Sequence, residues 1–311
     1  AGCTVIVKPA PETPLTALAL AELACRAGLP AGVLNVVTGN AEAIGGELTS
    51  NSKVRMITFT GSTQVGKLLM RQSADTVKKL SLELGGNAPF IVFDDADLDA
   101  AVAGTVASKF RNSGQTCVSA NRILVQSGIY ERFAKKLAEA VSQLKVGVGT
   151  ATEVNQGPLI SEEGLKKVEA HVRDAVSHGA KLLVGGERHQ LGRTFYVPTI
   201  LTEMTPNMRI AQEETFGPVA ALFRFHDERE AVTLANDTPF GLAAYFFTQS
   251  LSRAWRVAEA LEYGMIGVNE GMISSVAAPF GGVKESGLGR EGSHHGIEEF
   301  LELKYVMMGG L

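Results

Sequence analysis

The sequence predicts an α/β fold of two units, each a parallel sheet with covering helices. Short apolar runs that are typical of buried strands alternate with amphipathic helical patterns in the first part of the chain. This alternation is the pattern of right-handed βαβ units, in which a helix connects two parallel strands. The chain has 311 residues, more than one core usually organises, so we expect two domains.

The first unit contains three predicted strands, at 5–7, 33–37 and 54–59. Thr13 and Pro14 form a good helix start, because threonine caps a helix and proline fits its first turn. They predict a helix over 15–27, which Gly28 ends. The third strand runs directly into a glycine turn at 60–63, and apolar residues at helical spacing follow it. This order is strand, glycine turn, helix.

We place a boundary at Leu84, after which the alternation repeats. The predicted strands are 89–93 and 122–126, and the predicted helices are 97–112, which Asp97 caps, and 129–144. A further helix begins at Ser161, is closed by Gly179, and carries the apolar residues Leu165, Val168, Val172 and Val176. Residues 264–292 are glycine-rich, and we expect them to be irregular. The apolar end at 305–308 needs cover, so we expect an added strand at a subunit interface.

The composition favours small molecules as partners. The formal net charge is -4 and the basic residues are scattered, so the sequence shows no cluster of positive charge that would bind nucleic acid or an anionic membrane. No apolar run reaches membrane-spanning length. The cysteines Cys3, Cys25 and Cys117 have no metal-ligand spacing, so we expect neither a disulfide framework nor a metal site. Their sparseness favours a reducing compartment such as the cytoplasm.

Cys117 lies in surroundings that suit a nucleophile. It ends the polar stretch Ser113-Gly114-Gln115-Thr116-Cys117, a loop that could expose the sulfur. Upstream, Glu83 precedes Gly85 and Gly86, where a substrate or cofactor could approach closely and a carboxylate could activate water. A thiol nucleophile and a water-activating carboxylate are the two halves of an aldehyde oxidation. The alternatives are an inert core thiol and a glutamate solvated at a strand end.

Gly61 opens a phosphate-binding candidate. Residues 61–68 satisfy the first seven positions of a Walker A pattern, but the eighth is Leu68, where magnesium binding requires serine or threonine. This argues against an ATPase, and the three-glycine dinucleotide fingerprint is absent too. A helix amino terminus beside Ser62 remains, which could hold a pyrophosphate with its free backbone donors. A simple turn is the alternative.

Arg111 precedes Cys117 by six residues, near the predicted end of a helix. Its two-pronged guanidinium could clamp a substrate carboxylate, or it could be a helix-end cation that complements the dipole. His294 and His295 are adjacent, so we expect them to point different ways at the surface. No histidine is placed to pair with Cys117.

Six motifs in order along the chain resemble the aldehyde dehydrogenase superfamily. They are Lys8-Pro9-Ala10, Phe59-Thr60-Gly61-Ser62-Thr63, Glu83-Leu84-Gly85-Gly86, Gly114-Gln115-Thr116-Cys117, Glu213-Glu214-Thr215-Phe216-Gly217-Pro218 and Pro279-Phe280-Gly281-Gly282. Within the superfamily, the runs 107–112, 292–297 and 303–305 resemble bacterial succinate-semialdehyde dehydrogenases of the NADP-dependent type.

The resemblance implies that Cys117 attacks an aldehyde, that a hydride then leaves for the nicotinamide, and that Glu83 activates the water that hydrolyses the thioester. It implies cofactor contacts from Lys8, Gly61, Ser62, Glu214 and Phe216, and substrate-carboxylate contacts from Arg111 and Ser274. NAD-preferring relatives carry a glutamate three residues after the lysine, where this chain has Pro11 followed by Glu12. We therefore expect NADP to be preferred, with NAD as the alternative.

The resemblance also implies three parts. They are a partial Rossmann-type cofactor domain over 1–84, an α/β catalytic domain over 85–282, and a segment over 283–311 that returns to the cofactor domain and ends in an oligomerisation strand. The pattern begins about a third of the way in, so we expect a carboxyl-terminal portion of a homo-oligomer, dimer or tetramer. The alternatives are another semialdehyde or aliphatic aldehyde as substrate, and an inactive fragment that acts only as an interaction module.

Overall fold

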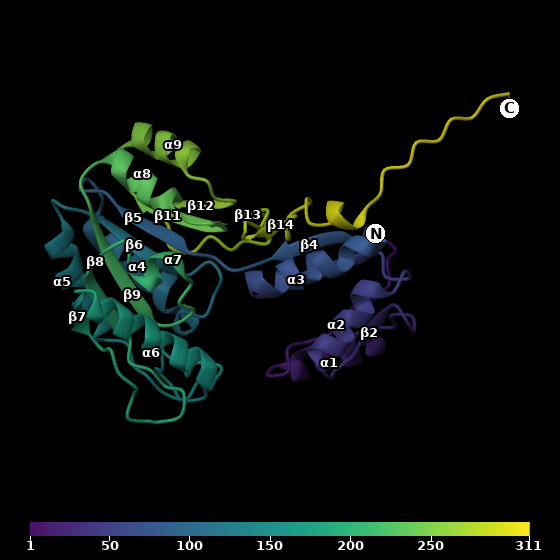
Figure 1. Ribbon diagram of the computed structural model, residues 1–311, viewed down its shortest axis with the longest axis horizontal. Coiled ribbons are helices and arrows are strands. Elements are labelled where there is room, and N and C mark those ends of the chain that lie inside the picture. Colours follow the sequence, from purple (N-terminus) through teal and green to yellow (C-terminus); the bar gives the residue numbers. More distant parts are fainter. Residues whose placement is uncertain (311) are drawn as a thin grey trace.

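The computed structural model describes residues 1–310, which form two lobes (Figure 1). The smaller lobe contains the first three α-helices, and the larger lobe is built on a seven-stranded sheet. The end of the chain points away from both lobes (Figure 1). Within the described residues, no helix is both long enough and apolar enough to cross a membrane.

The smaller lobe is made of two parallel strand pairs. Strand β1 (Val5–Val7) pairs with β2 (Leu34–Val36), and β3 (Met56–Thr60) pairs with β4 (Lys79–Glu83). The helices are α1 (Pro14–Arg26), α2 (Ala41–Ser50) and α3 (Thr63–Ser73), followed by the 3₁₀ turn η1 (Ala74–Thr76). Helix α1 connects the first pair and α3 the second, so the predicted βαβ units are confirmed.

The sheet of the larger lobe has the order β12-β11-β5-β6-β9-β8-β7, and all neighbours are parallel except β7 and β8. Its strands are β5 (Ala88–Val92), β6 (Ala120–Gln126), β7 (Lys181–Val184), β8 (Thr199–Met204), β9 (Val219–Phe225), β11 (Ala243–Phe247) and β12 (Met265–Val268). Its helices are α4 (Leu98–Phe110), α5 (Tyr130–Val141), α6 (Glu162–Ser177), α7 (Arg209–Gln212), α8 (Glu228–Asn236) and α9 (Leu251–Ala260).

Both faces of this sheet are covered, which explains the continuous apolar runs of its central strands. In β5, Ile91 packs in one core with α6, α8 and α9, while Phe90 and Val92 pack in the other with α4 and α5. Successive strand residues point to opposite faces, so an all-apolar strand fills two cores at once.

The carboxyl-terminal segment returns to the smaller lobe. Strand β14 (Gly287–Leu288) pairs antiparallel with β4, and Gly287 lies opposite Glu83. Just before it, β13 (Val283–Lys284) pairs antiparallel with β10 (Phe240–Gly241) of the larger lobe. The segment therefore ties the two lobes together beside Glu83. The division at 84 and 282 stays a prediction.

The helix starts predicted from capping residues are confirmed with one difference. Asp97 accepts hydrogen bonds from the amides of Asp99 and Ala100, and Ser161 accepts one from Gly164. Thr13 precedes α1 as predicted, but its side chain makes no capping bond to the described residues. The start of α1 thus depends on Pro14 rather than on a threonine cap.

Three expectations were wrong in detail. The glycine-rich stretch after 264 contains β12, so it is not irregular throughout. Val176 is 46% exposed and does not belong to the buried face of α6. The rings of His294 and His295 lie on the same side, with centroids 3.9 Å apart, although both residues are exposed as expected. Residues 301–310 form no strand within the single described chain, so the expected strand at a subunit interface stays a prediction.

Candidate active site

The predicted nucleophile Cys117 follows a loop with an unusual backbone. Helix α4 ends at Phe110, and the 3₁₀ turn η2 (Arg111–Gly114) leads towards Cys117. Asn112, Ser113 and Gly114 all have positive φ, at 52°, 56° and 73°. Left-handed backbone is unfavourable for residues with a side chain, and it persists where the surroundings hold it, often at functional sites. Here Ser113 donates to the carbonyl of Gly157 at 2.9 Å.

Gly86 brings the base segment against this loop. A β-carbon at Gly86 would lie 2.5 Å from the carbonyl oxygen of Cys117, so only glycine permits the contact. We expected the glycines after Glu83 to make room for a substrate or cofactor. At Gly86, the close neighbour is instead the backbone of the predicted nucleophile. Glu83 and Cys117 are therefore brought to one place by backbone contact.

Glu83, the last residue of β4, is a buried carboxylate. It is 3% exposed, so the alternative of a solvated glutamate is wrong. Neither carboxylate oxygen has a hydrogen-bond partner among the described residues. Burial, followed by the charge of the Glu291 carboxylate, raises the pKa of Glu83 to about 8, and Arg290 opposes this shift. A buried carboxyl without a protein partner and with a pKa near neutrality is suited to exchange protons with a small molecule.

Cys117 is half-buried, not sealed in the core. Burial raises the pKa of its thiol to about 11, and the charges of Glu214 and Glu83 raise it as well. The thiol is therefore protonated at neutral pH in the free chain. Because both carboxylates act on the thiol, the three side chains share one electrostatic environment. A nucleophilic role requires that the thiol lose this proton as its sulfur forms a bond.

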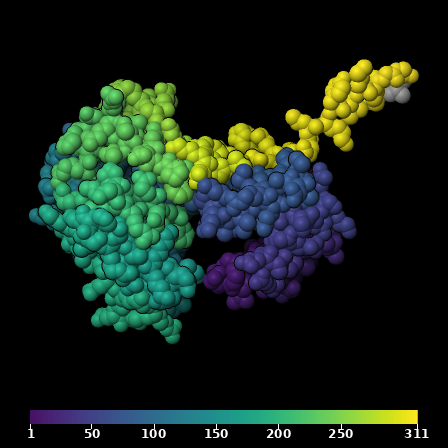
Figure 2. Space-filling model, viewed as in Figure 1, coloured from purple at the N-terminus to yellow at the C-terminus, as the bar shows by residue number. Residues whose placement is uncertain are grey.

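Glu214 and Phe216 lie on the loop between α7 and β9. The amide of Gly86 donates to Glu214 Oε1 at 3.0 Å, and burial raises the pKa of Glu214. Phe216 has a φ of 55° and is 37% exposed. Its ring lines a cleft of about 730 Å³ between the lobes, visible in Figure 2. Other lining residues are Thr13, Asn112, Gln115, Ile160 and Arg193.

The remaining predicted cofactor residues follow the carboxyl ends of parallel strands. Lys8 comes directly after β1, and Gly61 and Ser62 come directly after β3. In open α/β sheets this edge is where nucleotides bind. The Ser62 side chain accepts from the amide of Val65 at 3.4 Å and so caps α3. As an acceptor there, its hydroxyl still has its own hydrogen to donate.

A dinucleotide fits these residues on one structural ground. The amides of Thr63 and Gln64, in the first turn of α3, make no hydrogen bond to any residue in the range 1–310. Together with the Ser62 hydroxyl they form a set of donors aimed from a helix amino terminus, which favours a phosphate. Lys8 Nζ donates only to the carbonyl of Pro9, at 2.6 Å, and an ammonium has further hydrogens to donate.

Arg111 and Ser274 are not brought together by any contact that the structure shows. Both are exposed, and neither side chain hydrogen-bonds to a described residue. Arg111 is nevertheless close to the nucleophile loop. Burial raises the pKa of Tyr245, the charge of Arg111 lowers it, and the Tyr245 hydroxyl donates to the carbonyl of Val118 at 2.7 Å.

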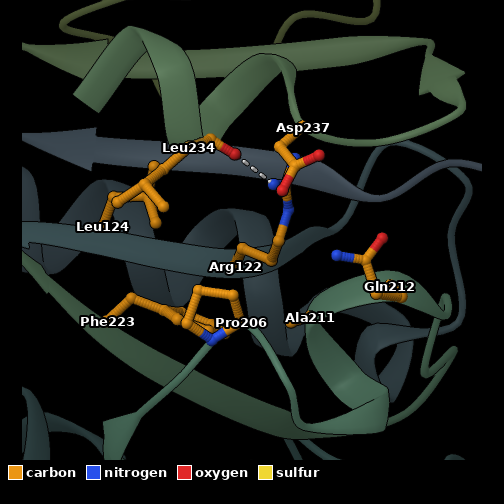
Figure 3. A pocket seen from close by; sticks show the side chains of 8 residues that line it. All are labelled: Arg122, Leu124, Pro206, Ala211, Gln212, Phe223, Leu234 and Asp237. Carbon is orange, nitrogen blue, oxygen red and sulfur yellow. Dashed lines mark hydrogen bonds between the residues drawn. The ribbon is translucent and has the colours of Figure 1, made fainter. Parts of the chain in front are cut away.

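Three buried groups near the site were missed from sequence. Lys109, in the last turn of α4, is 1% exposed, and burial lowers its pKa to about 7, with Glu214 opposing the shift. His171 is fully buried against the loop that carries Glu214. Arg122 is buried in β6 beside a second cavity of only about 20 Å³, where it donates to backbone carbonyls (Figure 3). This cavity is too small for a ligand, so Arg122 has a structural role.

Comparison with known proteins matches residues 1–306 to the family described as the aldehyde dehydrogenase family. The chain belongs to this family. The fold of this aldehyde dehydrogenase chain is therefore that of the family. Among solved structures, one titled an Escherichia coli NADP-dependent enzyme superposes with a TM-score of 0.98 at 61% identity, covering 98% of this chain and 64% of that one.

Relatives with named substrates share the whole length of this aldehyde dehydrogenase chain. The mitochondrial succinate-semialdehyde dehydrogenase of Arabidopsis thaliana is 63% identical over 100% of this chain and 59% of its own. The NADP(+) succinate-semialdehyde dehydrogenase of Escherichia coli is 61% identical over 99% and 64%. A 3-sulfolactaldehyde dehydrogenase of Pseudomonas putida is 62% identical over 100% and 64%. The chain thus spans about three-fifths of the length of these relatives.

Proposed function

We propose that this chain carries the catalytic machinery of an NADP-dependent semialdehyde dehydrogenase, with succinate semialdehyde as substrate. The observation that carries the proposal is the pairing of Cys117 with a buried, partnerless Glu83 carboxyl at the same point of the fold. A thiol that forms an acyl intermediate and a base that activates water are the groups that aldehyde oxidation to an acid requires.

In this proposal the Cys117 sulfur bonds to the aldehyde carbon, and its thiol proton passes to the new alkoxide. A bound nicotinamide dinucleotide supplies the acceptor for the hydride that the carbon then loses. As the hydride leaves, the hydroxyl proton is released to water, and Cys117 retains the product as a thioester. Glu83 takes a proton from water, the water oxygen bonds to the acyl carbon, and the sulfur leaves. The backbone amide of Cys117 stabilises the oxyanion, an interaction of the kind worth about 3 kcal/mol.

Lys8, Gly61 and Ser62 would hold the adenosine half of NADP, and Glu214 and Phe216 the nicotinamide half. The presence of Pro11 supports NADP over NAD, because a carboxylate at that position would repel a 2'-phosphate. The named relatives are consistent with this cofactor.

The substrate would carry an anionic group far from the aldehyde. Arg111 and Ser274 would bind this group, since a guanidinium matches the geometry of a carboxylate. Relatives named for succinate semialdehyde and for 3-sulfolactaldehyde both act on aldehydes with a distal anion. Glutarate semialdehyde and simple aliphatic aldehydes are the alternatives within this class.

The assembly would be a homo-oligomer in the cytoplasm. Residues 301–308, which include the exposed Leu303, Tyr305 and Met307, would add a strand to a second subunit. The rival hypothesis is an interaction module without activity of its own.

NADPH formation at 340 nm tests these choices. The native chain would be assayed with three aldehydes: succinate semialdehyde, glutarate semialdehyde and butyraldehyde. Cys117→Ala serves as the control. We expect turnover of succinate semialdehyde that the substitution abolishes. Equal rates with butyraldehyde would contradict the anionic substrate, and a folded chain without any turnover would favour the interaction module.

A further inference from the structure

His171 contacts both neighbours of Glu214. This histidine lies in α6 and is fully buried. It is not one of the site residues predicted from the sequence. Its Nδ1 lies 3.1 Å from Thr215 Oγ1, and its Nε2 lies 3.0 Å from Glu213 Oε2. One imidazole thus bridges the residues before and after a predicted cofactor ligand.

The partners of the imidazole determine its tautomer. Hydrogen bonding from Arg209 lowers the pKa of Glu213 to about 2, so its carboxylate only accepts hydrogen bonds. Nε2 must therefore carry the hydrogen and donate to Glu213. Burial lowers the pKa of His171, which keeps the ring neutral, so Nδ1 accepts from the Thr215 hydroxyl. Both bonds have a defined direction, and both ring nitrogens are used.

The loop alternates like a strand at this point. Glu213 has extended backbone, with φ −110° and ψ 139°, so neighbouring side chains point to opposite sides. Glu213 and Thr215 face α6 and His171, while Glu214 faces the amide of Gly86. Fixing the two outer side chains therefore fixes the direction of the one between them.

The backbone of the loop is anchored separately. The Asn121 side chain donates to the carbonyl of Glu213 and accepts from the amide of Thr215, both at 3.0 Å. Asn121 thus holds the chain in place, and His171 holds the side chains. Phe216 follows directly with a φ of 55°, so its orientation depends on the residue before it being held.

We propose that His171 is a positioning residue for hydride transfer, which acts by holding Glu214 and Phe216 in the orientation that the nicotinamide half of the dinucleotide requires. The inference rests on the proposed function. It assigns His171 to the oxidation step, because within the described residues the ring hydrogen-bonds to Thr215 and Glu213 and to neither Cys117 nor Glu83. The charge of Glu214 also acts on the Cys117 thiol, so acyl chemistry without hydride transfer should change little beside the loss in oxidation.

The test compares two reactions of the same chain. NADPH formation from succinate semialdehyde requires hydride transfer, whereas hydrolysis of p-nitrophenyl acetate without dinucleotide requires only Cys117 and an activated water. We expect His171→Leu to lower the turnover number of the first by about 10²-fold, the loss typical of a small misplacement. Its KM for the aldehyde and its ester hydrolysis should stay near the native values. His171→Gln, which keeps a donor and an acceptor, should recover much of the loss.

The controls separate the possible failures. His178→Leu, at the exposed end of the same helix, should leave both reactions unchanged, and Cys117→Ala should abolish both. If His171→Leu does not fold, Thr215→Val removes only the hydroxyl bonded to Nδ1. This variant should also lose NADPH formation while it retains ester hydrolysis. Equal losses in both reactions, or no loss in either, would overturn the role of His171. A native chain that catalyses neither reaction would contradict the proposed function, and the inference would fall with it.

Discussion

The carbonyl oxygen of Cys117 lies against the α-carbon of Gly86, where a β-carbon would approach it to 2.5 Å. The two residues come from separate segments, one after β4 and one before β6. Their contact joins the segment of the predicted base to the loop of the predicted nucleophile. The obstacle is backbone, which cannot rotate away as a side chain could.

We predict that Gly86→Ala displaces the Cys117 loop. The methyl group has no space, so we expect a loss of about 1–3 kcal/mol in the free energy of unfolding and of about 10²-fold in turnover. Denaturant titration and NADPH formation measure the two effects. Gly46→Ala in α2 is the matched control, because a β-carbon there meets no atom within 4 Å. Equal behaviour of the two variants would contradict the packing argument.

The raised pKa of Glu83 predicts the pH dependence of the reaction. Its base form accumulates only above its pKa of about 8, so hydrolysis of the thioester should become faster as the pH rises through that value. Single-turnover measurements of acid release between pH 6 and pH 10 report this step. Glu83→Gln should abolish this rise of the hydrolysis rate with pH and slow the hydrolysis by about 10²-fold or more. A rate that falls with pH over this range would exclude Glu83 as the base.

Arg111 should matter for anionic substrates only. A charge-assisted hydrogen bond to a carboxylate contributes about 1.5–3 kcal/mol, so Arg111→Ala should lower kcat/KM for succinate semialdehyde by about 10-fold to 100-fold. The value for butyraldehyde should not change. Arg193→Ala, at an arginine that lines the cleft beside Phe216, is a second variant that separates loss of general positive charge from loss of a specific contact. Similar losses with both aldehydes would indicate that Arg111 acts as a helix-end cation.

The residue at position 11 should control cofactor choice. In the proposed binding mode, the carboxylate of Pro11→Glu would repel the 2'-phosphate of NADP, so kcat/KM for NADP should fall relative to that for NAD. Steady-state kinetics with both dinucleotides measure the ratio, and Glu12→Gln tests whether the neighbouring glutamate already influences it. A native chain that prefers NAD would contradict the expectation.

Much of the fold could be predicted because local signals and burial agree. Asp97 and Ser161 carry their caps in their own side chains, and the all-apolar run at 89–93 requires cover on both faces. Strand β12 escaped prediction because glycine near it suggested a loop, although the strand is completed by pairing with β11. The information that makes β12 a strand lies in its partner β11, not in its own residues.

The site was partly predictable for a similar reason. Cys117 and Glu83 belong to motifs that can be recognised along the chain. Lys109 lies in the run 107–112 without standing out there, and His171 belongs to no motif, because the importance of both arises from burial beside Glu214 and its loop. A lysine near a helix end normally faces solvent, and a histidine on an amphipathic helix gives no hint of two buried partners.

The most direct test of the account is to trap the acyl group on Cys117. Glu83→Gln would be incubated with succinate semialdehyde and NADP, and the mass of each peptide would then be measured. We predict one succinyl group on the peptide that contains Cys117, formed with one equivalent of NADPH, and no such group in the Cys117→Ala, Glu83→Gln double variant. An unmodified Cys117, or full turnover by Glu83→Gln, would contradict the assignment of nucleophile and base.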